Sequence, residues 1–241
     1  MRRLYLILLS IHFSFLSGQD REVDLFYTET NLSAPEIVFI SGHYPINVYY
    51  AQKTREEFKK YTERHGYGFY YEVSEPMETK QHALHFRRCQ IIQKAFALYP
   101  SAQWLVWVDS DVYVNRPDLR LEDQIDLSDT SILYHLFHEK PWSFPVNTGV
   151  KIVNRDAIEL EQEVWDLRNT DPWNQFPYEQ KTIIEYIIPK IPGRYIIHDP
   201  YVLNCILNLY PDKVKDALFV HMCARSTKDR NKIMRFRRNR F

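Results

Sequence analysis

The chain is poor in cysteine, carries no net charge and lacks an apolar run long enough to cross a membrane. Its three cysteines, Cys89, Cys205 and Cys223, are too few and too scattered for a disulfide framework or a zinc site. One pair could bridge in an oxidising compartment, and the sequence leaves that pairing open. With a formal net charge of zero, no overall field attracts nucleic acid, and we expect no nucleic-acid partner. The 241 residues, 45% of them hydrophobic, are enough for one large α/β domain.

The first 34 residues have a different character from the rest. A basic start, Met1-Arg2-Arg3, precedes an apolar run over residues 4–16, which is shorter than the about 20 residues of a membrane span. We interpret residues 1–18 as a signal peptide or a short signal anchor and the polar residues 19–34 as a stem. Asn31-Leu32-Ser33 is an acceptor pattern for glycosylation. We therefore expect a protein of the secretory pathway, in the Golgi or ER lumen or secreted, with membrane association possible through residues 4–16.

Strand-like and helix-like segments alternate over the first half of the remaining chain. Short continuous apolar runs predict strands, and apolar residues at helical spacing predict helices. Each crossover is long enough for parallel strands, so the pattern predicts an α/β fold with a mixed, mostly parallel central sheet flanked by helices. The expected elements are strands at 36–40, 69–73 and 104–108 and helices at 51–64 and 83–98.

The alternation is looser in the second half of the chain. We expect further strands at 130–136, 150–153 and 218–221, and a helix at 177–188 with Pro177 in its first position. Asp156 and Glu159 form a capping-box pattern that predicts another helix as far as Leu167. Residues 226–241 are strongly basic. We interpret them as a solvated tail, the alternative being a segment that contacts phosphates or an acidic surface.

The predicted strand at 104–108 ends in Asp109-Ser110-Asp111. In open α/β sheets, ligands bind beyond the carboxyl ends of the strands. If the extended geometry continues, both carboxylates point the same way, and two such charges are costly unless a cation or hydrogen-bond donors compensate them. A divalent metal that also holds phosphates would do so. The alternative is a strand end followed by a turn that Asp109 or Ser110 caps.

Other polar residues follow predicted strands or begin predicted helices. A Ser-Gly turn after a first strand is a common place for a nucleotide, and an arginine early in a helix can reach a phosphate. A histidine together with carboxylates suits Mn²⁺ better than Mg²⁺, because nitrogen is a softer ligand than oxygen. Each residue also has a structural explanation, such as a plain turn or a carboxylate that complements a helix dipole. The residues are Ser41, Gly42, Arg88, Glu179, Gln180 and His221.

Together, these segments resemble glycosyltransferase family 34, the galactosyl-, mannosyl- and xylosyltransferases of the fungal and plant Golgi. The resemblance covers about residues 36 to 225, and its matching segments follow one another in the family's order. After His221 the family usually reads Phe-x-Gly-Cys-Lys, whereas this chain has Met222-Cys223-Ala224-Arg225. The matching segments are 53–55, 61–67, 99–111, 147–149, 164–166, 179–180, Asn204 and 219–221.

The resemblance implies a GT-A fold over residues 35–225 and a metal-dependent, retaining transfer. A hexose or pentose would move from a nucleotide-diphosphate sugar, UDP favoured over GDP, to a glycan or glycoprotein acceptor. Mn²⁺ would be the cofactor, bound by Asp109, Asp111 and His221, and Glu179 and Gln180 would orient the donor sugar and stabilise its cationic character. The donor-binding residues that we expect are Ser41, Gly42, Arg88, Asp109, Ser110, Asn147, Gly149 and Arg225.

Two other functions remain open at the level of the sequence. A metal-dependent phosphohydrolase could use Asp109 and Asp111, but that class normally needs further carboxylates in short motifs near the pair, and the sequence has none there. A non-catalytic protein of the same fold could bind a sugar nucleotide without turnover. The altered sequence after His221 is the feature that suggests it.

Overall fold

The computed structural model describes residues 34–73, 80–139 and 144–237. The predicted signal segment, nearly all of the predicted stem and the acceptor Asn31 lie outside these ranges. The strands are β1 Ile37–Gly42, β2 Gly68–Glu72, β3 Trp104–Val108, β4 Val112–Val114, β5 Tyr134–Phe137, β6 Asn147–Asn154, β7 Tyr195–His198, β8 Cys205–Ile206 and β9 Phe219–His221. The α-helices are α1 Tyr49–His65, α2 Gln81–Leu98, α3 Ile158–Asp166, α4 Glu179–Thr182 and α5 Thr227–Phe236.

A six-stranded mixed sheet in the order β2-β1-β3-β6-β5-β7 forms the centre of the domain. β1 pairs in parallel with both β2 and β3, whereas β6 runs antiparallel to β3 and β5. The predicted α/β class and the mostly parallel sheet are therefore confirmed. The parallel half contains the β-α-β-α-β order that the sequence predicts, and the carboxyl ends of β1 and β3 lie at the same edge of the sheet.

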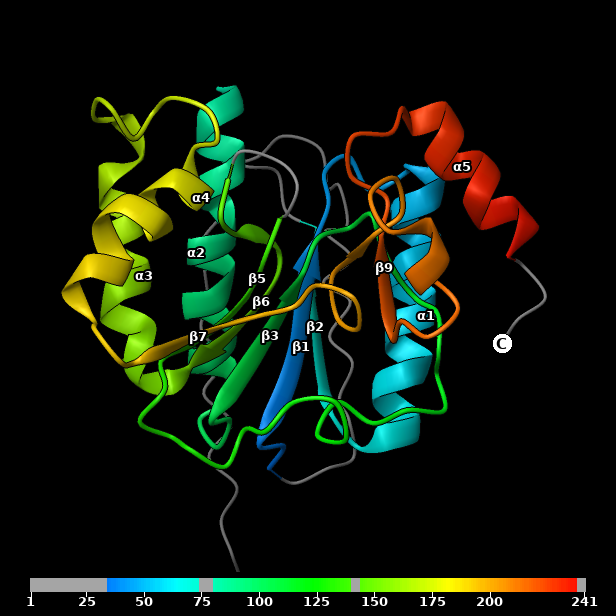
Figure 1. Ribbon diagram of the computed structural model, residues 1–241, viewed down its shortest axis with the longest axis horizontal. Coiled ribbons are helices and arrows are strands. Elements are labelled where there is room, and N and C mark those ends of the chain that lie inside the picture. The colour runs from blue at the N-terminus through cyan, green and yellow to red at the C-terminus, as the bar shows by residue number, and fades with distance from the viewer. Residues whose placement is uncertain (1–33, 74–79, 140–143, 238–241) are drawn as a thin grey trace, which may run out of the picture.

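Helices cover both faces of this sheet (Figure 1). Successive side chains of a strand point to opposite faces, so Val38 and Ile40 pack in a core cluster with α2, whereas Ile37 and Phe39 pack with α1. Figure 1 shows α2 and α3 on one side of the sheet and α1 on the other. The continuous apolar runs in the sequence follow from this burial on both faces.

A second, three-stranded sheet in the order β4-β9-β8 lies on the α1 side of the domain. β4 pairs antiparallel with β9 and places Val112 opposite His221. The predicted strand at 218–221 is thus present as β9, but it lies in this small sheet and not in the central one. The chain passes from the central sheet to the small sheet directly after β3, at the Asp-Ser-Asp segment.

The C-terminal segment is a packed helix, so the prediction of a solvated tail is wrong for residues 227–236. Ser226 caps α5 by accepting a hydrogen bond from the backbone N–H of Asp229 at 3.2 Å. Met234 is buried, and Asn231 accepts a hydrogen bond from the backbone N–H of Tyr50 in α1 at 3.0 Å. The segment has so many basic residues that its few apolar positions, which pack α5 against the rest of the domain, do not stand out in the sequence.

Helix ends differ in detail from the predictions. Gly66 ends α1 in the left-handed conformation with φ 79°, a backbone geometry that glycine adopts readily. The cap before α3 is Asn154, which accepts from the backbone N–H of Asp156 at 2.9 Å, so the capping box at Asp156 is wrong. The predicted helix at 177–188 is a short α4 followed by a π-helical turn at Ile183–Ile187 and a 3₁₀ turn at Ile188–Lys190.

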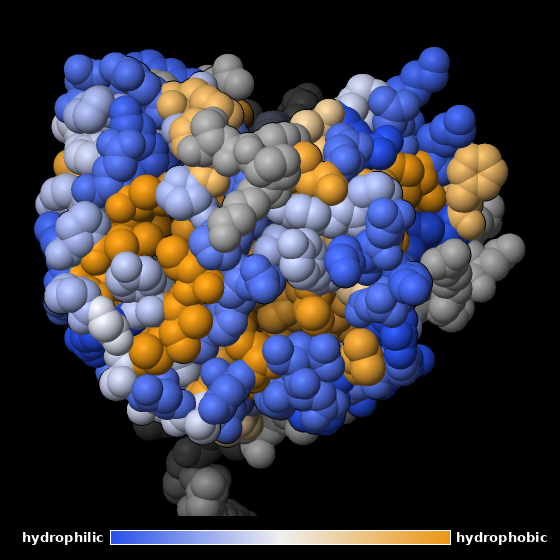
Figure 2. Space-filling model, in the orientation of Figure 1, coloured by the Kyte–Doolittle hydropathy of each residue, from blue (hydrophilic) through white to orange (hydrophobic). Residues whose placement is uncertain are grey.

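Across the described part of the chain, no helix combines the length and the apolar character that a membrane span requires. The face in Figure 2 is mostly hydrophilic, with apolar surface gathered over the region where β7 lies at the edge of the central sheet. In β7, Ile196 is 39% exposed.

Candidate active site

A tight turn after β3 positions the two aspartates. The backbone N–H of Val112 donates to the carbonyl of Asp109 at 2.9 Å, and the N–H of Asp109 donates to the carbonyl of Gly149 at 2.7 Å. The extended geometry that the sequence suggested therefore does not continue past Val108. The turn, and not strand alternation, brings the carboxylates of Asp109 and Asp111 to the same side.

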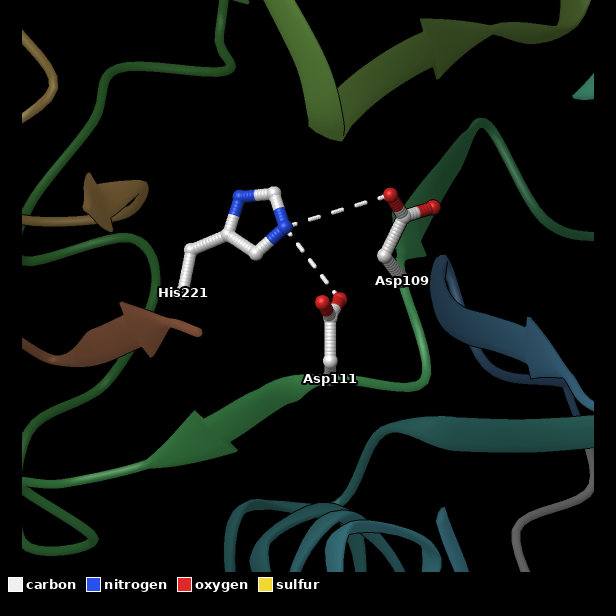
Figure 3. Close-up of side chains that lie close together, drawn as sticks. All are labelled: Asp109, Asp111 and His221. Atoms are coloured by element: carbon white, nitrogen blue, oxygen red, sulfur yellow. Dashed lines mark ion pairs between the residues drawn. The ribbon is translucent and has the colours of Figure 1, made fainter. Parts of the chain in front are cut away.

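His221 completes a three-residue cluster with these aspartates (Figure 3). Its Nε2 lies 3.2 Å from Oδ1 of Asp111 and 4.0 Å from Oδ2 of Asp109. One ligand atom from each residue lies within 4.8 Å of the others. The β4–β9 pairing creates this proximity, because Val112 follows Asp111 directly and lies opposite His221. Two carboxylate oxygens and an imidazole nitrogen form a donor set that fits a divalent transition metal such as Mn²⁺.

Gly149 provides the space that the imidazole ring occupies. A Cβ at this position would lie 2.1 Å from Cε1 and 2.7 Å from Nδ1 of His221. Any other residue at position 149 would therefore displace the ring. The prediction placed Gly149 in the sugar pocket, and the structure places it both in the cavity wall and directly against the histidine.

Charged neighbours shift the pKa of two members of the cluster, Asp111 and His221. Burial raises the pKa of Asp111, but the charges of His221 and Arg230 outweigh burial and lower it to about 2. Burial likewise lowers the pKa of His221, and Cys223 and Asp111 outweigh that effect and raise it above its usual value. Nη2 of Arg230 lies 2.7 Å from Oδ2 of Asp111. Asp111 thus stays a carboxylate, the form that can bind a metal ion.

Arg88 on α2 lies beside Asp109, near the position that the sequence suggested for a phosphate contact. Its Nη2 is 3.3 Å from Oδ1 of Asp109, and its Nη1 donates to the carbonyl of Thr148 at 2.7 Å. The indole N–H of Trp107 donates to the same Oδ1 at 2.8 Å. Oδ1 of Asp109 is therefore held by the protein, and Oδ2 faces His221.

The carboxylate of Glu179 is buried and ion-paired. Lys151, itself 0% exposed, lies 2.8 Å from Oε1, and Thr148 Oγ1 donates to Oε2 at 2.9 Å. Burial raises the pKa of Glu179, but Lys151 and Arg88 outweigh it and lower the pKa below its usual value. The neighbouring Gln180 accepts from the N–H of Thr148 at 3.2 Å. Both residues line the site with side chains that the protein holds in place.

Two cavities meet at this cluster. The larger, about 560 Å³, contains His221, Glu179 and Gln180 in its wall. The smaller, about 310 Å³, lies next to the end of β1 at Gly42. Both are lined by the same five residues at their junction, which are His85, Arg88, Asp109, Asp111 and Arg230.

A profile of the galactosyl transferase GMA12/MNN10 family matches residues 34–176. The chain belongs to this family. The resemblance read from the sequence is confirmed, and membership favours the transferase prediction over the phosphohydrolase. The profile ends before β9, so His221 and the whole of α5 lie outside the matched residues.

Solved and curated relatives agree with the galactosyl transferase GMA12/MNN10 family. A crystal structure of a glycosyltransferase involved in the glycosylation of the major capsid of PBCV-1 is 58% identical, with a TM-score of 0.82, and the match covers 84% of this chain and 100% of that one. An α-1,2-galactosyltransferase of Schizosaccharomyces pombe is 28% identical over 78 residues, 32% of this chain. An uncharacterised α-1,2-galactosyltransferase of the same yeast is 35% identical over 74 residues, 29% of this chain. Each match spans 21% of the yeast protein's length.

The structure of this family member brings most of the predicted site residues together. Gly42 and Ser110 line the smaller cavity, and Ser110 Oγ lies 2.8 Å from Nδ1 of His43. Ser41 is buried in β1, and within the described residues neither Ser41 nor Arg225 lines either of the two cavities. Arg230, five positions beyond Arg225, is the residue of this segment that reaches the junction of the cavities, together with Arg88 from α2.

Sequence reasoning missed three residues of the site. Arg230 was hidden in a basic stretch, although Ser226 and Asp229 form a capping pattern that could have identified a helix there. Glu139 lies two residues after β5, is 5% exposed and lines the larger cavity. No motif marks it. His85 also reaches the junction, where its ring stacks on Tyr178 with the centroids 4.8 Å apart.

Proposed function

We propose that this protein is a Mn²⁺-dependent, retaining glycosyltransferase. It moves a hexose or pentose from a nucleotide-diphosphate sugar, with UDP favoured over GDP, to a glycan or glycoprotein acceptor. The observation that carries the proposal is the position of Asp109, Asp111 and His221 at the junction of two cavities. Membership of the galactosyl transferase GMA12/MNN10 family supports the reaction class.

Asp109, Asp111 and His221 would hold the metal. When bound, Mn²⁺ neutralises the charge that develops on a diphosphate leaving group. Arg230 lies 2.7 Å from Asp111 and Arg88 lies 3.3 Å from Asp109, so each carboxylate has one arginine beside it. We assign the donor phosphates to these two guanidinium groups, because arginine matches phosphate geometry with paired hydrogen bonds. Arg230 thus takes the role that the sequence suggested for Arg225.

The contacts of the two buried carboxylates, Glu179 and Glu139, support front-face attack, in which the acceptor approaches the anomeric carbon from the side of the leaving phosphate. Glu179 is ion-paired to Lys151, and both oxygens of Glu139 accept hydrogen bonds from side-chain amides, so neither is poised as a covalent nucleophile. The acceptor hydroxyl oxygen forms its bond to the anomeric carbon while the bond from that carbon to the phosphate oxygen breaks. The departing phosphate oxygen takes the hydroxyl proton. Glu179 stays anionic and offsets the positive charge on the sugar ring in the transition state.

The two cavities suggest where each half of the reaction lies. The smaller one adjoins Gly42 and Tyr44 at the carboxyl end of β1, where open α/β sheets bind nucleotides. The larger one has a polar inner wall and an aromatic rim of Phe144 and Phe176, whose ring centroids are 5.7 Å apart. Phe176 is 69% exposed. We place the donor sugar against the polar wall and the acceptor sugar against the rim, because sugars present an apolar face to aromatic rings.

We further propose that the protein works in the lumen of the secretory pathway. The support is the basic start, the apolar run over residues 4–16 and the Asn31 acceptor pattern. Endoglycosidase treatment of the protein from a eukaryotic host would shift its electrophoretic mobility if Asn31 receives a glycan. An unchanged mobility would leave the lumenal proposal without this support.

The decisive experiment compares Asp111→Asn with Asp212→Asn, an exposed control. Hydrolysis of a set of UDP- and GDP-sugars is measured with and without Mn²⁺, and folding is checked by circular dichroism. We expect the wild type and the control to release nucleotide only with the metal. The rate of donor hydrolysis by Asp111→Asn should be at least a hundredfold lower than that of the wild type. If Asp111→Asn kept the full metal-dependent rate, the assignment of the metal site would be wrong. If the wild type hydrolysed none of the donors, a non-catalytic protein would be favoured.

A further inference from the structure

A continuous chain of buried side chains connects Glu139 to the metal-facing histidine. Nδ2 of Asn147 donates to Oε1 of Glu139 at 2.9 Å, and Nδ2 of Asn204 donates to Oδ1 of Asn147 at 3.0 Å. Oδ1 of Asn204 lies 3.0 Å from Nδ1 of His221. All four side chains are at most 8% exposed. The three polar contacts therefore exchange little with water, and each one determines the direction of the next.

Backbone N–H groups fix the direction of this chain. An amide side chain can be turned end for end, but a backbone N–H can only donate. The N–H of Gly149 donates to Oδ1 of Asn147 at 2.9 Å, so the NH₂ group of Asn147 must face Glu139. Asn147 Oδ1 then accepts from the NH₂ group of Asn204, which leaves Oδ1 of Asn204 for His221.

The result is a defined hydrogen position on the imidazole. Because Asn204 presents an oxygen, Nδ1 of His221 carries a hydrogen and donates it, and Nε2 is the ring nitrogen that can offer a lone pair. Nε2 is also the nitrogen that faces Asp109 and Asp111. We propose that Glu139, Asn147 and Asn204 are positioning residues that select Nε2 of His221 for the metal. The inference rests on the metal-binding role proposed above.

Glu139 is suited to the start of the chain because a carboxylate accepts at both oxygens. Its second oxygen, Oε2, accepts from Nε2 of Gln180 at 3.1 Å, and Gln180 is itself fixed by the backbone N–H of Thr148. A glutamine at position 139 would turn one NH₂ group toward another, either at Asn147 or at Gln180. Replacing Glu139 by its neutral isostere should therefore disturb the chain even though the shape is kept.

The first experiment changes Asn204 and measures Mn²⁺ affinity by titration calorimetry on the full-length protein without donor. Asn204→Leu removes the acceptor for Nδ1 and should weaken Mn²⁺ binding 10- to 100-fold, the range for such outer partners of a metal ligand. Asn204→Asp keeps an acceptor for Nδ1 of His221 but sets an oxygen against Oδ1 of Asn147, so its Mn²⁺ affinity should lie between those of wild type and Asn204→Leu. Asn208→Leu, exposed on the same segment, is the matched control. Equal affinities for all four proteins would overturn the proposal.

The second experiment exchanges the polarity of one contact. Glu139→Gln and Asn147→Asp should each weaken Mn²⁺ binding about tenfold or more, the first through opposed NH₂ groups and the second through opposed carboxylates. The double variant exchanges donor and acceptor in the contact between residues 139 and 147, keeps the other hydrogen bonds of the chain and keeps the total charge. Its affinity should therefore return to within about threefold of wild type.

Thermal unfolding of each variant separates positioning from folding. Additive losses in the double variant would overturn the proposed chain while leaving the metal role intact. Absence of Mn²⁺ binding by the wild type would overturn both proposals. Rescue of the melting temperature without rescue of Mn²⁺ affinity would show a structural role only and would also overturn the inference.

Discussion

The guanidinium of Arg230 lies 2.7 Å from the carboxylate of Asp111, although one residue belongs to the last helix and the other follows the third strand. Nε of Arg230 also donates to the carbonyl of Met222 at 3.2 Å, and its guanidinium lies 5.3 Å from the ring centroid of Tyr50. The arginine is therefore fixed on three sides at the entrance to both cavities. Through this contact, α5 contributes a side chain to the candidate active site.

Replacing Arg230 by alanine should raise KM for the nucleotide-sugar donor about 10- to 100-fold, because a hydrogen bond to a charged group contributes about 1.5–3 kcal/mol. Lysine at this position keeps the charge but loses the planar fork and should lie between alanine and wild type. Steady-state kinetics with varied donor would measure the effect, and Lys232→Ala on the exposed side of α5 is the control. An unchanged donor KM for Arg230→Ala would exclude the phosphate role.

Alanine at Gly149 should weaken metal binding without unfolding the domain. The added Cβ would lie 2.1 Å from the imidazole of His221, so the ring must leave its place and we expect at least a tenfold loss of Mn²⁺ affinity. Gly193 offers a contrast, because it has φ +76° and no atom within 4 Å of an added Cβ. Gly193→Ala should cost roughly 1 kcal/mol of stability through backbone strain and leave Mn²⁺ binding intact. The prediction fails if the two variants bind Mn²⁺ equally well.

Methionine at Lys151 should strongly destabilise the fold. Lys151 is 0% exposed and ion-paired at 2.9 Å to Glu161 and 2.8 Å to Glu179. Its loss removes the buried counter-ion of Glu161 and leaves Glu179 with Arg88 at 3.6 Å, at a cost of about 3–5 kcal/mol. Urea unfolding would measure the change. Lys190→Met, which removes a half-exposed pair with Glu163, should cost less than about 1 kcal/mol. Similar losses in the two variants would contradict the assignment of Lys151 as a buried counter-ion.

Stability should fall as the pH is lowered from about 6.5 to 4, because the buried His135 is paired with the half-buried His198. Nδ1 of His135 lies 3.0 Å from Nε2 of His198. Burial, and then His198, lowers the pKa of His135 to about 4. In the unfolded chain the same imidazole takes up its proton near the ordinary histidine pKa of 6.5. The unfolded state therefore binds more protons in this window, and up to about 3 kcal/mol is lost as the pH falls through it.

Substituting His135 by leucine should flatten that part of the pH profile of unfolding free energy. Some slope remains in the variant, because the pKa of His198 is lowered as well, chiefly by burial. Chemical unfolding between pH 4 and 7 would measure both proteins. If wild type and variant lose stability in parallel over this range, the histidine pair is not the source.

Removing the ring of Phe176 should weaken acceptor binding and leave the donor half-reaction unchanged. Phe176→Ala is expected to raise the acceptor KM roughly tenfold, the loss of about 1–1.5 kcal/mol of aromatic contact. Transfer to a panel of p-nitrophenyl glycosides gives the acceptor KM, and donor hydrolysis in water gives the control reaction. Phe236→Ala removes a ring that is 80% exposed on α5 and should change neither. An acceptor KM equal to wild type would place the acceptor elsewhere.

Five strands of the central sheet could be predicted because they are buried and stand out as apolar runs. The edge strand β7 is partly exposed and was not predicted. The strand at 104–108 was predicted with the bounds that the structure shows. The small sheet could not be predicted in this way, since β4 and β8 have three and two residues and are too short to show a period. Yet this sheet, through the pairing of Val112 with His221, assembles the cluster that the sequence could only suggest.

The same limit applies to the residues around the cluster. Asp109, Asp111 and His221 stand at strand ends and could be proposed from position and chemistry. Glu139 is an isolated carboxylate in a loop, and its importance arises from two amides that reach it from β6 and α4. Arg230 occurs among other basic residues, and only the packing of α5 distinguishes it. A side chain whose role depends on tertiary contacts leaves no periodic signal in the chain.

The pairing of β4 with β9 also sets an order of events during synthesis. Asp109 and Asp111 emerge from the ribosome long before His221 and Arg230, and neither late residue can reach the aspartates until β9 has paired and α5 has packed. A nascent chain that has completed the central sheet is thus without its imidazole ligand and its second cation. On the proposed function, a chain that stops after β9 but before residue 230 should therefore keep its strands and lack transferase activity.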